Sequence, residues 1–505
     1  MNGYVIGIDQ GTTSTRAIVF DHSGVEKGRS QREHRQYYPR PGWTEHDAVE
    51  ILANTRKVIE GALQSAGVGV GEVVAVGIAN QTETTVLWDT ATGDPIAPAI
   101  TWQDTRGDAV LRTLAIDGEL ARRVEDECFV EVNGYFSATK IRWMLDNVPA
   151  ARELLAQHRL AFGSMESWLT WNLTGGARGG VHVTDASNAS RTLLMHLTKQ
   201  TWSDSALEFF GIPAEIMPTI MPTSGQIAVI HESETLGGVP LTALMGDQQA
   251  ATFGQTAFEA GEAKCTYGTG NFLIYNTGKT PQRSRNGLIT TVIYHRDGED
   301  PVYGLEGSIA VTGSLIQWLR DGLGVIGSAA DSESLALSVP DSGGVCIVPA
   351  FSGLYAPYWR GDVRGTVIGL THHSTAAHLV RASLESCAFQ TYDLIGAANA
   401  DTSVPLDALR VDGGMTRNEI LMQFQADLLG VPVSRSATIE MAALGVSYAA
   451  GLAVGFWRDL VEVRALWTEG GRFEPSMSET NRSRELARWN RALAATFAGA
   501  DPDPV

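Results

Sequence analysis

The sequence predicts an α/β protein whose two halves are similar domains facing a shared cleft. Short apolar strands alternate along the chain with segments of helical periodicity, a pattern typical of proteins built on central sheets. A strand, a turn containing Gly-Thr and a returning strand occur at residues 4–20 and again at residues 263–275, about half a chain apart. This separation is far longer than the period of a repeat array. A duplicated domain explains the repetition, and a chance likeness of two hairpins is the alternative.

The first hairpin has the composition of a phosphate-binding turn. Residues 4–9 predict a strand, residues 10–14 a tight turn and residues 15–21 the returning strand. Backbone N–H groups and hydroxyls on such a turn donate to phosphate oxygens, and an aspartate at the strand end can hold Mg²⁺ through water. Arg16 lies close enough along the chain to reach a phosphate. An ordinary polar hairpin turn is the alternative interpretation.

A helix and a buried strand are expected next. Asp47, followed three residues later by Glu50, resembles a capping box that begins a helix. Residues 73–79 form an apolar run that is too short for a buried helix, so they predict a strand. The apolar residues of the helix recur near helical spacing at Val49, Leu52, Val58, Ile59 and Leu63.

The second half begins with the repeated hairpin and ends in helices. Residues 263–267 and 271–275 predict its two strands, joined by a Gly-Thr-Gly turn. The later elements are a strand at 409–414, a helix at 418–430 closed by a C-terminal glycine, a short strand at 431–434, an Ala-rich helix at 442–453 and, over about the last 25 residues, an amphipathic helix with a frayed Asp-Pro tail.

Composition narrows the function classes. In 505 residues, 38 Lys and Arg against 57 Asp and Glu give a formal net charge of −19, which argues against a sequence-independent grip on nucleic acid or an anionic membrane. No apolar run approaches a membrane span and no secretion signal is recognisable, so we expect a soluble cytoplasmic protein. The cysteines form no disulfide or metal pattern, and we expect all four to be buried. They are Cys128, Cys265, Cys346 and Cys387.

Two further motifs suggest chemistry in a protein that lacks the P-loop sequence G-x-x-x-x-G-K-[ST]. A strand leads through Gly246-Asp247 into a helix, which places a carboxylate where it can accept a proton from an alcohol attacking a phosphoryl group. A helix N-cap is the alternative role for Asp247. Residues 80–84, 102–104 and 135–136 combine carboxylate, amide, indole and phenol groups, which suits a polyhydroxyl ligand.

Several motifs occur in the same order in one enzyme family. They are residues 9–16 (Asp-Gln-Gly-Thr-Thr-Ser-Thr-Arg), 41–47 (Pro-Gly-Trp-Thr-Glu-His-Asp), 135–147, 246–251 (Gly-Asp-Gln-Gln-Ala-Ala), 267–270 (Tyr-Gly-Thr-Gly), 313–320, 349–351, 356–359 (Ala-Pro-Tyr-Trp), 411–414 (Val-Asp-Gly-Gly) and 443–445. The combination covers nearly the whole chain and is far more specific than any one motif. The sequence therefore resembles the FGGY carbohydrate kinases, in the glycerol kinase branch.

The resemblance implies an actin-like ATPase fold, with two ribonuclease-H-like domains around a central cleft. Residues 1–251 would form the domain that holds the polyol, the phosphates and the catalytic base, and residues 252–505 the domain that holds the nucleotide. The implied cofactors are ATP and Mg²⁺. The implied assembly is a homodimer that acts on a small-molecule polyol and binds neither nucleic acid nor membrane.

The resemblance also assigns roles to individual residues. Asp247 becomes the general base, and Asp9 organises Mg²⁺ through water. The polyol would be held by Thr82, Glu83, Trp102, Tyr135, Asp247, Gln248 and Phe272. The nucleotide would be held by Thr12, Thr13, Ser14, Arg16, Thr269, Gly313, Gln317, Gly414 and Asn418.

Three residues depart from the usual pattern of that branch. Thr82 stands where an arginine normally hydrogen-bonds glycerol. Either glycerol remains the substrate, with water or a neighbouring arginine such as Arg106 filling the gap, or the pocket accepts a longer polyol of four carbons, such as threitol or erythritol, or of five. Tyr355 stands where a glycine is usual, and Arg360 where an acidic residue is usual.

Two functions from other classes stay open. A chaperone-like or filament-forming actin-like ATPase needs no alcohol-binding carboxylate, so the polyol cluster and Asp247 argue against it. A catalytically weak polyol sensor is compatible with Thr82.

Some bacterial members of the branch are inhibited by a sugar bisphosphate held on a basic loop. Here residues 234–240 are short and no Lys or Arg lies between residues 200 and 263, so we expect no such inhibition.

Overall fold

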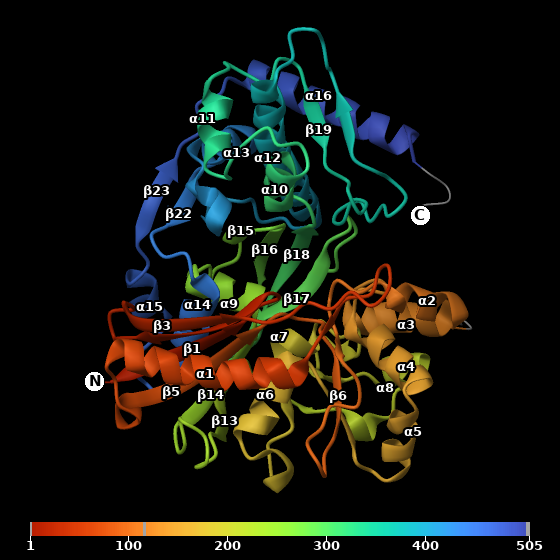
Figure 1. The fold of residues 1–505 in the computed structure, drawn as a ribbon, viewed down its shortest axis with the longest axis vertical. Coiled ribbons are helices and arrows are strands. Elements are labelled where there is room, and N and C mark those ends of the chain that lie inside the picture. The colour runs from red at the N-terminus through yellow and green to blue at the C-terminus, as the bar shows by residue number, and fades with distance from the viewer. Residues whose placement is uncertain (1–2, 115–117, 501–505) are drawn as a thin grey trace.

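Two mixed sheets, one in each half of the chain, form the framework of the computed structural model (Figure 1). The structure describes residues 3–114 and 118–500. The first sheet has the order β13-β14-β5-β1-β2-β3, with β1 (Tyr4–Gln10), β2 (Ser14–Phe20), β3 (Glu26–Glu33), β5 (Val73–Asn80), β13 (Ser224–Val229) and β14 (Pro240–Gly246). The second has the order β17-β18-β16-β15-β21-β22-β23, with β15 (Ala263–Tyr267), β16 (Asn271–Gly278), β17 (Ile289–Tyr294), β18 (Val302–Ile309), β21 (Leu409–Asp412), β22 (Val433–Ser436) and β23 (Glu469–Phe473).

The two sheets share one topology, which confirms the predicted duplication. In the first sheet β1, β2 and β3 are antiparallel neighbours, and β5 and β14 extend the sheet from β1 as parallel strands. In the second sheet β15, β16 and β18 are antiparallel, and β21 and β22 extend the sheet from β15 in parallel. The turn after β1 and the turn after β15 therefore occupy corresponding positions in the two halves.

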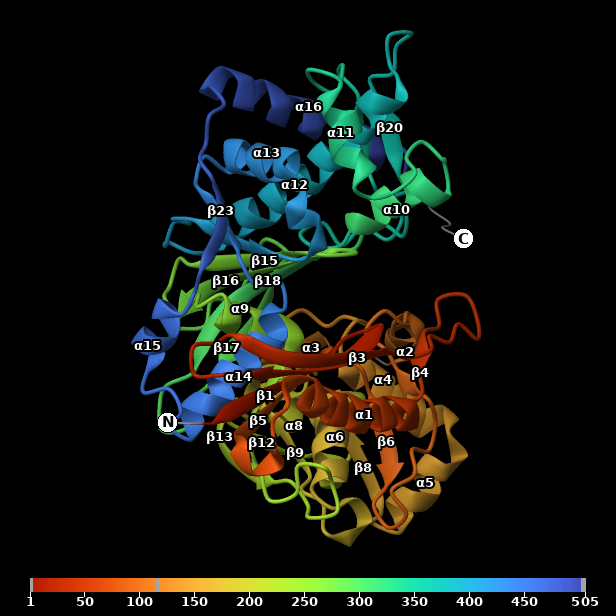
Figure 2. The ribbon, with the colours of Figure 1, turned by 60° about the vertical axis from the view of Figure 1, so that its left-hand side comes forward.

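Helices cover both sheets, with α1 lying across the first and α12, α13 and α16 gathered on the outer side of the second (Figure 2). The helices are α1 (Ala48–Ala66), α2 (Arg106–Thr113), α3 (Gly118–Cys128), α4 (Ser137–Asn147), α5 (Pro149–Ala156), α6 (Met165–Leu173), α7 (Ala186–Ala189), α8 (Asp204–Phe210), α9 (Asp247–Gly254), α10 (Gly313–Asp321), α11 (Asp331–Leu337), α12 (Ala376–Asp401), α13 (Glu419–Leu429), α14 (Met441–Ala453), α15 (Leu460–Ala465) and α16 (Glu479–Ala498). Short strand pairs complete the fold: β4 (Glu45–His46) with β7 (Ala99–Ile100), β6 (Val86–Asp89) with β8 (Leu160–Gly163), β9 (Val183–Asp185) with β12 (Thr219–Met221), β10 (Met195–His196) with β11 (Thr201–Trp202), and β19 (Cys346–Val348) with β20 (Thr366–Ile368).

Helix α14 joins the two halves. In sequence it lies between β22 and β23 of the second sheet, yet it packs against β1 and β5 of the first sheet and against α9. Glycines permit this close approach: a Cβ atom at Gly7 would lie 2.1 Å from the carbonyl oxygen of Ala443, and one at Gly445 would lie 1.8 Å from that of Ala250. The late Ala-rich helix predicted from the sequence is thus a structural link between the halves.

The predicted helix caps are largely confirmed. Asp47 begins α1 by accepting hydrogen bonds from the amides of Val49 and Glu50, but Glu50 accepts from the Arg35 amide and does not close a capping box. Val49 was expected on the apolar face and is 53% exposed, because it lies outside the arc of the helix that Ala48 and Ile51 share with the other buried residues. The other four predicted apolar positions, Leu52, Val58, Ile59 and Leu63, are buried.

The later predictions hold with small shifts. Asn418 caps α13 through the amide of Leu421, and Gly430, with φ 71°, closes the helix in the left-handed conformation. The strand expected at 431–434 is β22, displaced toward the C-terminus. The amphipathic C-terminal helix is α16, whereas residues 501–505 of the predicted tail lie outside the described residues.

The four cysteines are buried and carry free thiols, as expected. Within residues 3–114 and 118–500, the structure contains no helix with both the length and the apolar character needed to cross a membrane.

Candidate active site

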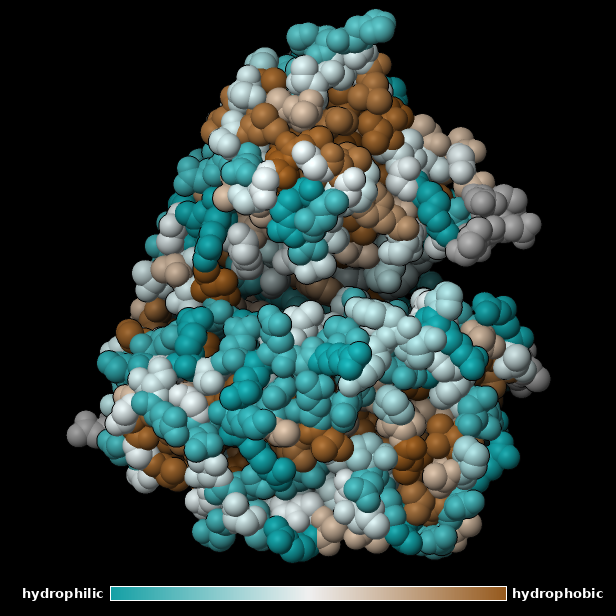
Figure 3. Space-filling model, in the orientation of Figure 1, coloured by the Kyte–Doolittle hydropathy of each residue, from teal (hydrophilic) through white to brown (hydrophobic). Residues whose placement is uncertain are grey.

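A cavity of about 480 Å³ lies between the two halves, where the loops following β1, β5 and β14 face the turn between β15 and β16 and the end of β18. The space-filling view shows a hollow running across the middle of the molecule at this level (Figure 3). Because strand ends from both sheets meet here, the cavity is built by both halves of the chain. This arrangement is the usual place for ligands in α/β proteins with parallel strands.

The two glycine-containing turns face each other across this cavity. In the first turn the amide of Gly11 donates to the carbonyl of Ser14 (2.9 Å), and the side chains of Thr12 and Thr13 line the cavity. In the second turn the amide of Gly268 donates to the carbonyl of Gly270 (2.9 Å), and Thr269 lines the cavity. Short turns of this kind present N–H and hydroxyl donors suited to phosphate oxygens.

The start of α10 rests on the second turn. The amide of Gly313 donates to the carbonyl of Gly268 (3.1 Å), and a Cβ atom at Gly313 would lie 2.3 Å from that same oxygen. Only glycine therefore fits at this contact. Gln317, one turn further along α10, reaches the cavity wall, whereas Gly313 itself does not.

Asp9 and Arg16 lie beside the first turn and form an ion-paired group. Arg16 Nε is 3.4 Å from Asp9 Oδ2, and the guanidinium also bonds Glu440 from the start of α14. Burial raises the pKa of Asp9 above its ordinary value, while Arg16 opposes that rise. Asp9 Oδ1 is buried without a hydrogen-bond partner among the described residues. This oxygen is thus free to bind a water or a cation.

Asp247 is the first residue of α9, at the point where β14 ends. The helix N-cap is Gly246, so the alternative role of Asp247 as an N-cap is wrong. Its Oδ1 accepts a hydrogen bond from the Gln248 amide (2.8 Å), and the side chain lines the cavity. Burial, with the nearby Asp9 carboxylate, raises its pKa to about 8, whereas the Lys264 ammonium acts in the opposite direction. A carboxylate with such a pKa is suited to exchange protons near neutral pH.

Gln248, next to this carboxylate, is held by the buried lysine. Lys264 Nζ donates to Gln248 Oε1 (2.5 Å) and to the hydroxyl of Thr266 (3.1 Å). Because the amide oxygen of Gln248 is already bonded, its N–H donors are left for a ligand. Burial lowers the pKa of Lys264, and the Asp412 and Asp247 carboxylates act against that fall.

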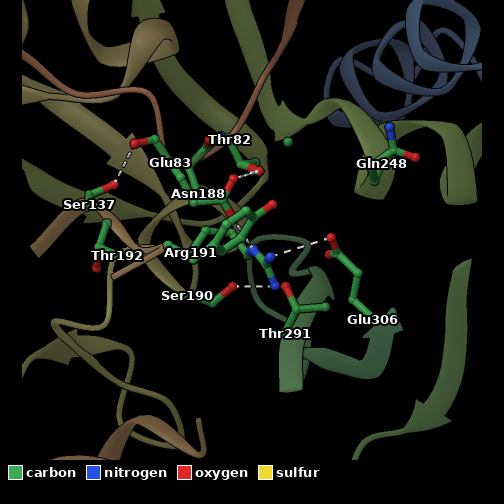
Figure 4. A network of polar contacts seen from close by, with 12 residues as sticks. Thr82, Glu83, Ser137, Asn188, Ser190, Arg191, Thr192, Gln248, Thr291 and Glu306 are labelled. Carbon is green, nitrogen blue, oxygen red and sulfur yellow. Dashed lines mark hydrogen bonds and ion pairs between the residues drawn. The ribbon is translucent and has the colours of Figure 1, made fainter. Parts of the chain in front are cut away.

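Glu83 projects from a strained three-residue turn. Its φ is 60°, an unusual value for a glutamate, and the amide of Thr84 donates to the carbonyl of Thr82 (2.8 Å) across it. The hydroxyl of Ser137 donates to the Glu83 carbonyl (3.2 Å) and helps to hold this backbone (Figure 4). Both carboxylate oxygens are bonded, Oε2 by the Thr82 hydroxyl and Oε1 by Arg191 Nε, each at 2.6 Å.

The arginine at this carboxylate is Arg191, and the expected candidate Arg106 is placed elsewhere. Arg106 is bonded to Asp104 and Glu45 and lies with its guanidinium 3.8 Å from the ring of Trp43. It does not line the cavity. The volume that a longer side chain at position 82 would fill is therefore not taken by Arg106.

A cluster of aromatic rings forms part of the cavity wall. The ring centroids of Trp102 and Phe272 are 6.0 Å apart, and those of Trp102 and Tyr135 are 6.3 Å apart, in edge-to-face arrangements. Trp102 Nε1 also donates to the Thr12 hydroxyl (2.9 Å), which ties this wall to the first turn. Tyr355 adds a ring at the rim, stacked on Trp359. Apolar walls with a few polar groups are typical of sites for polyhydroxyl ligands.

Most of the residues named from the sequence meet at this cavity. Those that line it are Thr12, Thr13, Thr82, Glu83, Trp102, Tyr135, Asp247, Gln248, Thr269, Phe272 and Gln317. Those that do not are Asp9, Ser14, Arg16, Gly313, Gly414 and Asn418. The first four of these lie at the two turns or behind them, and Gly414 and Asn418 lie between β21 and α13.

Sequence reasoning missed several residues of the site. Cavity-lining residues that it did not name are Gln36, Tyr38, Gln81, Gln103, Gly270, Glu306, Ser308, Ile309 and Ala310. Glu306 was the most detectable of them, because a carboxylate in the middle of an apolar strand is unusual unless it has a buried partner. Arg191 and Lys264 lie behind the cavity wall and bond its members.

Comparison with known proteins agrees with this geometry. Family models for the N-terminal and C-terminal domains of the FGGY family of carbohydrate kinases match residues 4–254 and 263–454. Proteins named glycerol kinase from Pseudarthrobacter chlorophenolicus and Renibacterium salmoninarum are each 54% identical over 503 residues, covering 100% of both chains.

The structure is also similar to solved structures. It matches Plasmodium falciparum glycerol kinase with ADP at a TM-score of 0.90 and 34% identity, covering 98% of each chain. A xylulose kinase from Rhodospirillum rubrum matches at a TM-score of 0.84 and 24% identity, covering 98% of this chain and 99% of that one, and shows the fold alone. The predicted actin-like architecture of two domains around a cleft is confirmed. The chain belongs to the FGGY family of carbohydrate kinases.

Proposed function

We propose that this kinase uses ATP to phosphorylate a terminal hydroxyl of a small polyol, with glycerol as substrate and glycerol 3-phosphate as product. Its relatives named glycerol kinase support this choice of substrate. The observation that carries the proposal is the composition of one cavity. Carboxylate, amide and aromatic groups suited to a polyol share it with two phosphate-type turns, and Asp247 lies among them.

Asp247 acts as the general base of this reaction. A hydroxyl bound beside Glu83, Gln248 and the aromatic walls donates its proton to an oxygen of Asp247 while it attacks the terminal phosphorus of ATP. The bond from that phosphorus to the bridging oxygen breaks, and ADP leaves with the electron pair. The buried, low-dielectric setting that raises the pKa of Asp247 also makes it a stronger proton acceptor than an exposed aspartate. The two turns hold the phosphates so that attack proceeds in line, and positioning supplies most of the acceleration in such reactions.

The nucleotide would contact residues at or behind the two turns. These are Thr12, Thr13, Ser14, Arg16, Thr269, Gly313, Gln317, Gly414 and Asn418. Residues 1–251 would then hold the polyol, the phosphates and the base, and residues 252–505 most of the nucleotide site.

We further propose that the active molecule is a homodimer. Light scattering of the purified protein measures the mass of the assembly and tests this proposal.

The residues present fit a magnesium ion that is bound together with the nucleotide. Asp9 Oδ1 is buried beside the first turn without a partner, and the described residues contain no group of three or more His, Cys, Asp or Glu that forms a complete protein cage. Mg²⁺ is usually held by one or two carboxylates, several waters and the substrate phosphates, which agrees with a single aspartate. When bound, the ion would neutralise charge on the phosphate oxygens.

Thr82 favours a second candidate substrate, a four-carbon polyol such as threitol or erythritol. Its hydroxyl is bonded to Glu83 Oε2, so it offers a ligand neither the charge nor the reach of an arginine. The shorter side chain leaves space beside Glu83 for an additional hydroxymethyl group. A five-carbon polyol requires still more of this space and is the third candidate.

Product analysis tests the proposed activity. The purified protein is incubated with ATP, Mg²⁺ and one polyol at a time, and ³¹P NMR identifies the products. A terminal phosphate monoester that forms with glycerol supports the main proposal, and one that forms with threitol or erythritol but not with glycerol supports the second candidate. Nucleotide hydrolysis without a phosphorylated polyol contradicts both and favours an actin-like ATPase, whereas polyol binding without turnover favours a sensor.

A further inference from the structure

The carboxylate of Glu83 is one end of a buried chain of charges, and the proposed reaction gives a role to Glu83 alone among them (Figure 4). Arg191 follows α7 and is fully buried, with its side chain 1% exposed. Its Nε donates to Glu83 Oε1 at 2.6 Å, and its Nη2 lies 3.4 Å from Glu306 Oε1. Glu83 and Glu306 both line the cavity, and Arg191 lies behind them. One guanidinium therefore fixes two carboxylates of the same cavity.

This chain of charges crosses from one half of the molecule to the other. Glu306 belongs to β18 of the second sheet, while Glu83 and Arg191 belong to the first half. Gln249, in α9, donates to Glu306 Oε2 and to the Thr291 hydroxyl, each at 3.1 Å. The network therefore links β18 of the second sheet to the loop that carries Glu83.

Glu83 needs such support because its own backbone does not favour its position. A non-glycine residue at φ 60° is strained, and strain of this kind persists only when surrounding contacts hold it. The carbonyl of Glu83 is held by the Ser137 and Thr85 hydroxyls, each at 3.2 Å. The side chain, in contrast, is oriented only by Thr82 and Arg191 among the hydrogen bonds of the described residues.

The remaining N–H groups of the guanidinium are available to a further ligand. Arg191 Nη1 and Nη2 are buried and make no hydrogen bond among the described residues, and Nη2 has only the 3.4 Å ion pair with Glu306. Buried donors are normally satisfied, so a water or another polar group close to the cavity wall is expected to accept from them.

We propose that Arg191 is a positioning residue of the polyol site, which orients the Glu83 carboxylate and ties it to Glu306 so that both carboxylates face the bound polyol. This inference rests on the proposed function. Arg191 does not itself touch the reacting atoms. Its contribution is to polyol affinity, through Glu83, and not to the nucleotide site.

Steady-state kinetics of Arg191→Gln, Arg191→Lys and Glu306→Gln test this role. In Arg191→Gln we expect the KM for the preferred polyol to rise about tenfold or more, because Glu83 is no longer fixed, while the KM for ATP changes less than about twofold. Arg191→Lys restores a charge and is expected to recover part of the polyol KM. Glu306→Gln keeps the shape and is expected to raise the polyol KM by a smaller factor, about threefold.

Arg488 offers a matched control, because it is a largely buried arginine, with its side chain 12% exposed, that is bonded to two glutamates, Glu385 and Glu485, at 2.7 and 2.6 Å. It lies in α16 and does not line the cavity. Arg488→Gln is expected to lower the melting temperature but to leave both KM values unchanged. If Arg191→Gln does not fold, Arg191→Lys and Glu306→Gln carry the test.

The inference is overturned if the folded Arg191 and Glu306 variants keep the wild-type polyol KM, or if the KM values for polyol and ATP rise together. A wild-type protein that phosphorylates no polyol overturns the proposed function and this inference with it. A wild-type protein that is active while the variants keep their polyol KM overturns this inference alone.

Discussion

Replacing Asp247 by asparagine should give a protein that is much less active and yet more stable. Asparagine keeps the shape of the side chain but cannot accept the proton of an attacking hydroxyl. Loss of a general base usually lowers turnover by about 10²–10⁴. The change in stability is a separate consequence of the same environment, so that one substitution tests both the chemistry and the electrostatics of the site.

The stability gain follows from the pKa of Asp247, which burial and Asp9 raise from 3.8 to about 8. An acid whose pKa is higher in the folded chain than in the unfolded chain destabilises the fold once it ionises. The cost is absent at pH values below the unfolded pKa, grows as the pH rises, and is complete above about pH 8. Each pKa unit corresponds to about 1.4 kcal/mol, which bounds the cost at on the order of 5 kcal/mol. Because the side chain keeps partial contact with solvent, we expect about 1–3 kcal/mol.

Urea unfolding of wild type and Asp247→Asn at about pH 5 and about pH 9 measures this cost. The variant should exceed the wild type by more at the higher pH. Asp393→Asn is the matched control, because burial raises the pKa of Asp393 to about 7 and neither Asp393 nor its partners Tyr358 and Trp489 line the cavity. That control should keep full turnover. An Asp247→Asn protein with wild-type turnover would show that Asp247 is not the base, and a gain independent of pH would refute the electrostatic reasoning.

Three further predictions concern pH, substrate and regulation. The kcat/KM of the wild type should rise with pH and level off above about pH 8. Because the Lys264 ammonium lowers the pKa of Asp247, Lys264→Met should move the inflection of this profile to higher pH. An unmoved inflection in a folded Lys264→Met protein contradicts the assignment of Asp247 as the base. Thr82→Arg should lower the KM for glycerol by about 10-fold or more and weaken the binding of four-carbon polyols, since each charge-assisted hydrogen bond contributes roughly 1.5–3 kcal/mol. An unchanged KM for glycerol would show that the side chain at position 82 does not limit glycerol binding. Millimolar fructose bisphosphate should leave the rate unchanged. Arg56 reaches the loop at 234–240, but it is already paired with Glu234 at 2.7 Å. Severalfold inhibition that maps to this loop refutes the prediction.

Local patterns in the sequence were sufficient to predict the elements that carry the site. The two hairpins, the Asp47 cap and the Gly430 terminus each depend on residues close together in the chain. Asp247 could likewise be placed at the end of a strand, because the apolar run before it and the small residues after it mark the boundary. Predictions of this kind hold because backbone geometry and hydrogen bonding decide them locally.

Contacts between distant segments could not be predicted in the same way. Nothing near Arg191 in the chain indicates that its partners are Glu83 and Glu306, which lie more than a hundred residues away on either side. Arg106 is close in sequence to Trp102 and was therefore a candidate to fill the space at Thr82. Ion pairs with Asp104 and Glu45 hold it elsewhere. Burial of a charge is decided by the tertiary fold, and so is the choice of its partner.

The exposed position of Val49 has a local cause. Its neighbours Ala48 and Ile51 in the same turns of α1 are buried, and at 100° per residue Val49 lies outside the arc that the buried residues share. A residue near helical spacing from some apolar residues is therefore not always on the buried face.

Coupled ADP release from ATP, measured with the purified protein on glycerol, erythritol, both threitols, dihydroxyacetone and a five-carbon polyol, tests most directly whether the cavity is a polyol kinase site. We expect ADP release to depend on the polyol, to be greatest with glycerol, and to fall by about 10²–10⁴ in Asp247→Asn with the same polyol. ADP release that is equal with and without every polyol, or that survives in the Asp247→Asn protein, would contradict the assignment of both the substrate and the base.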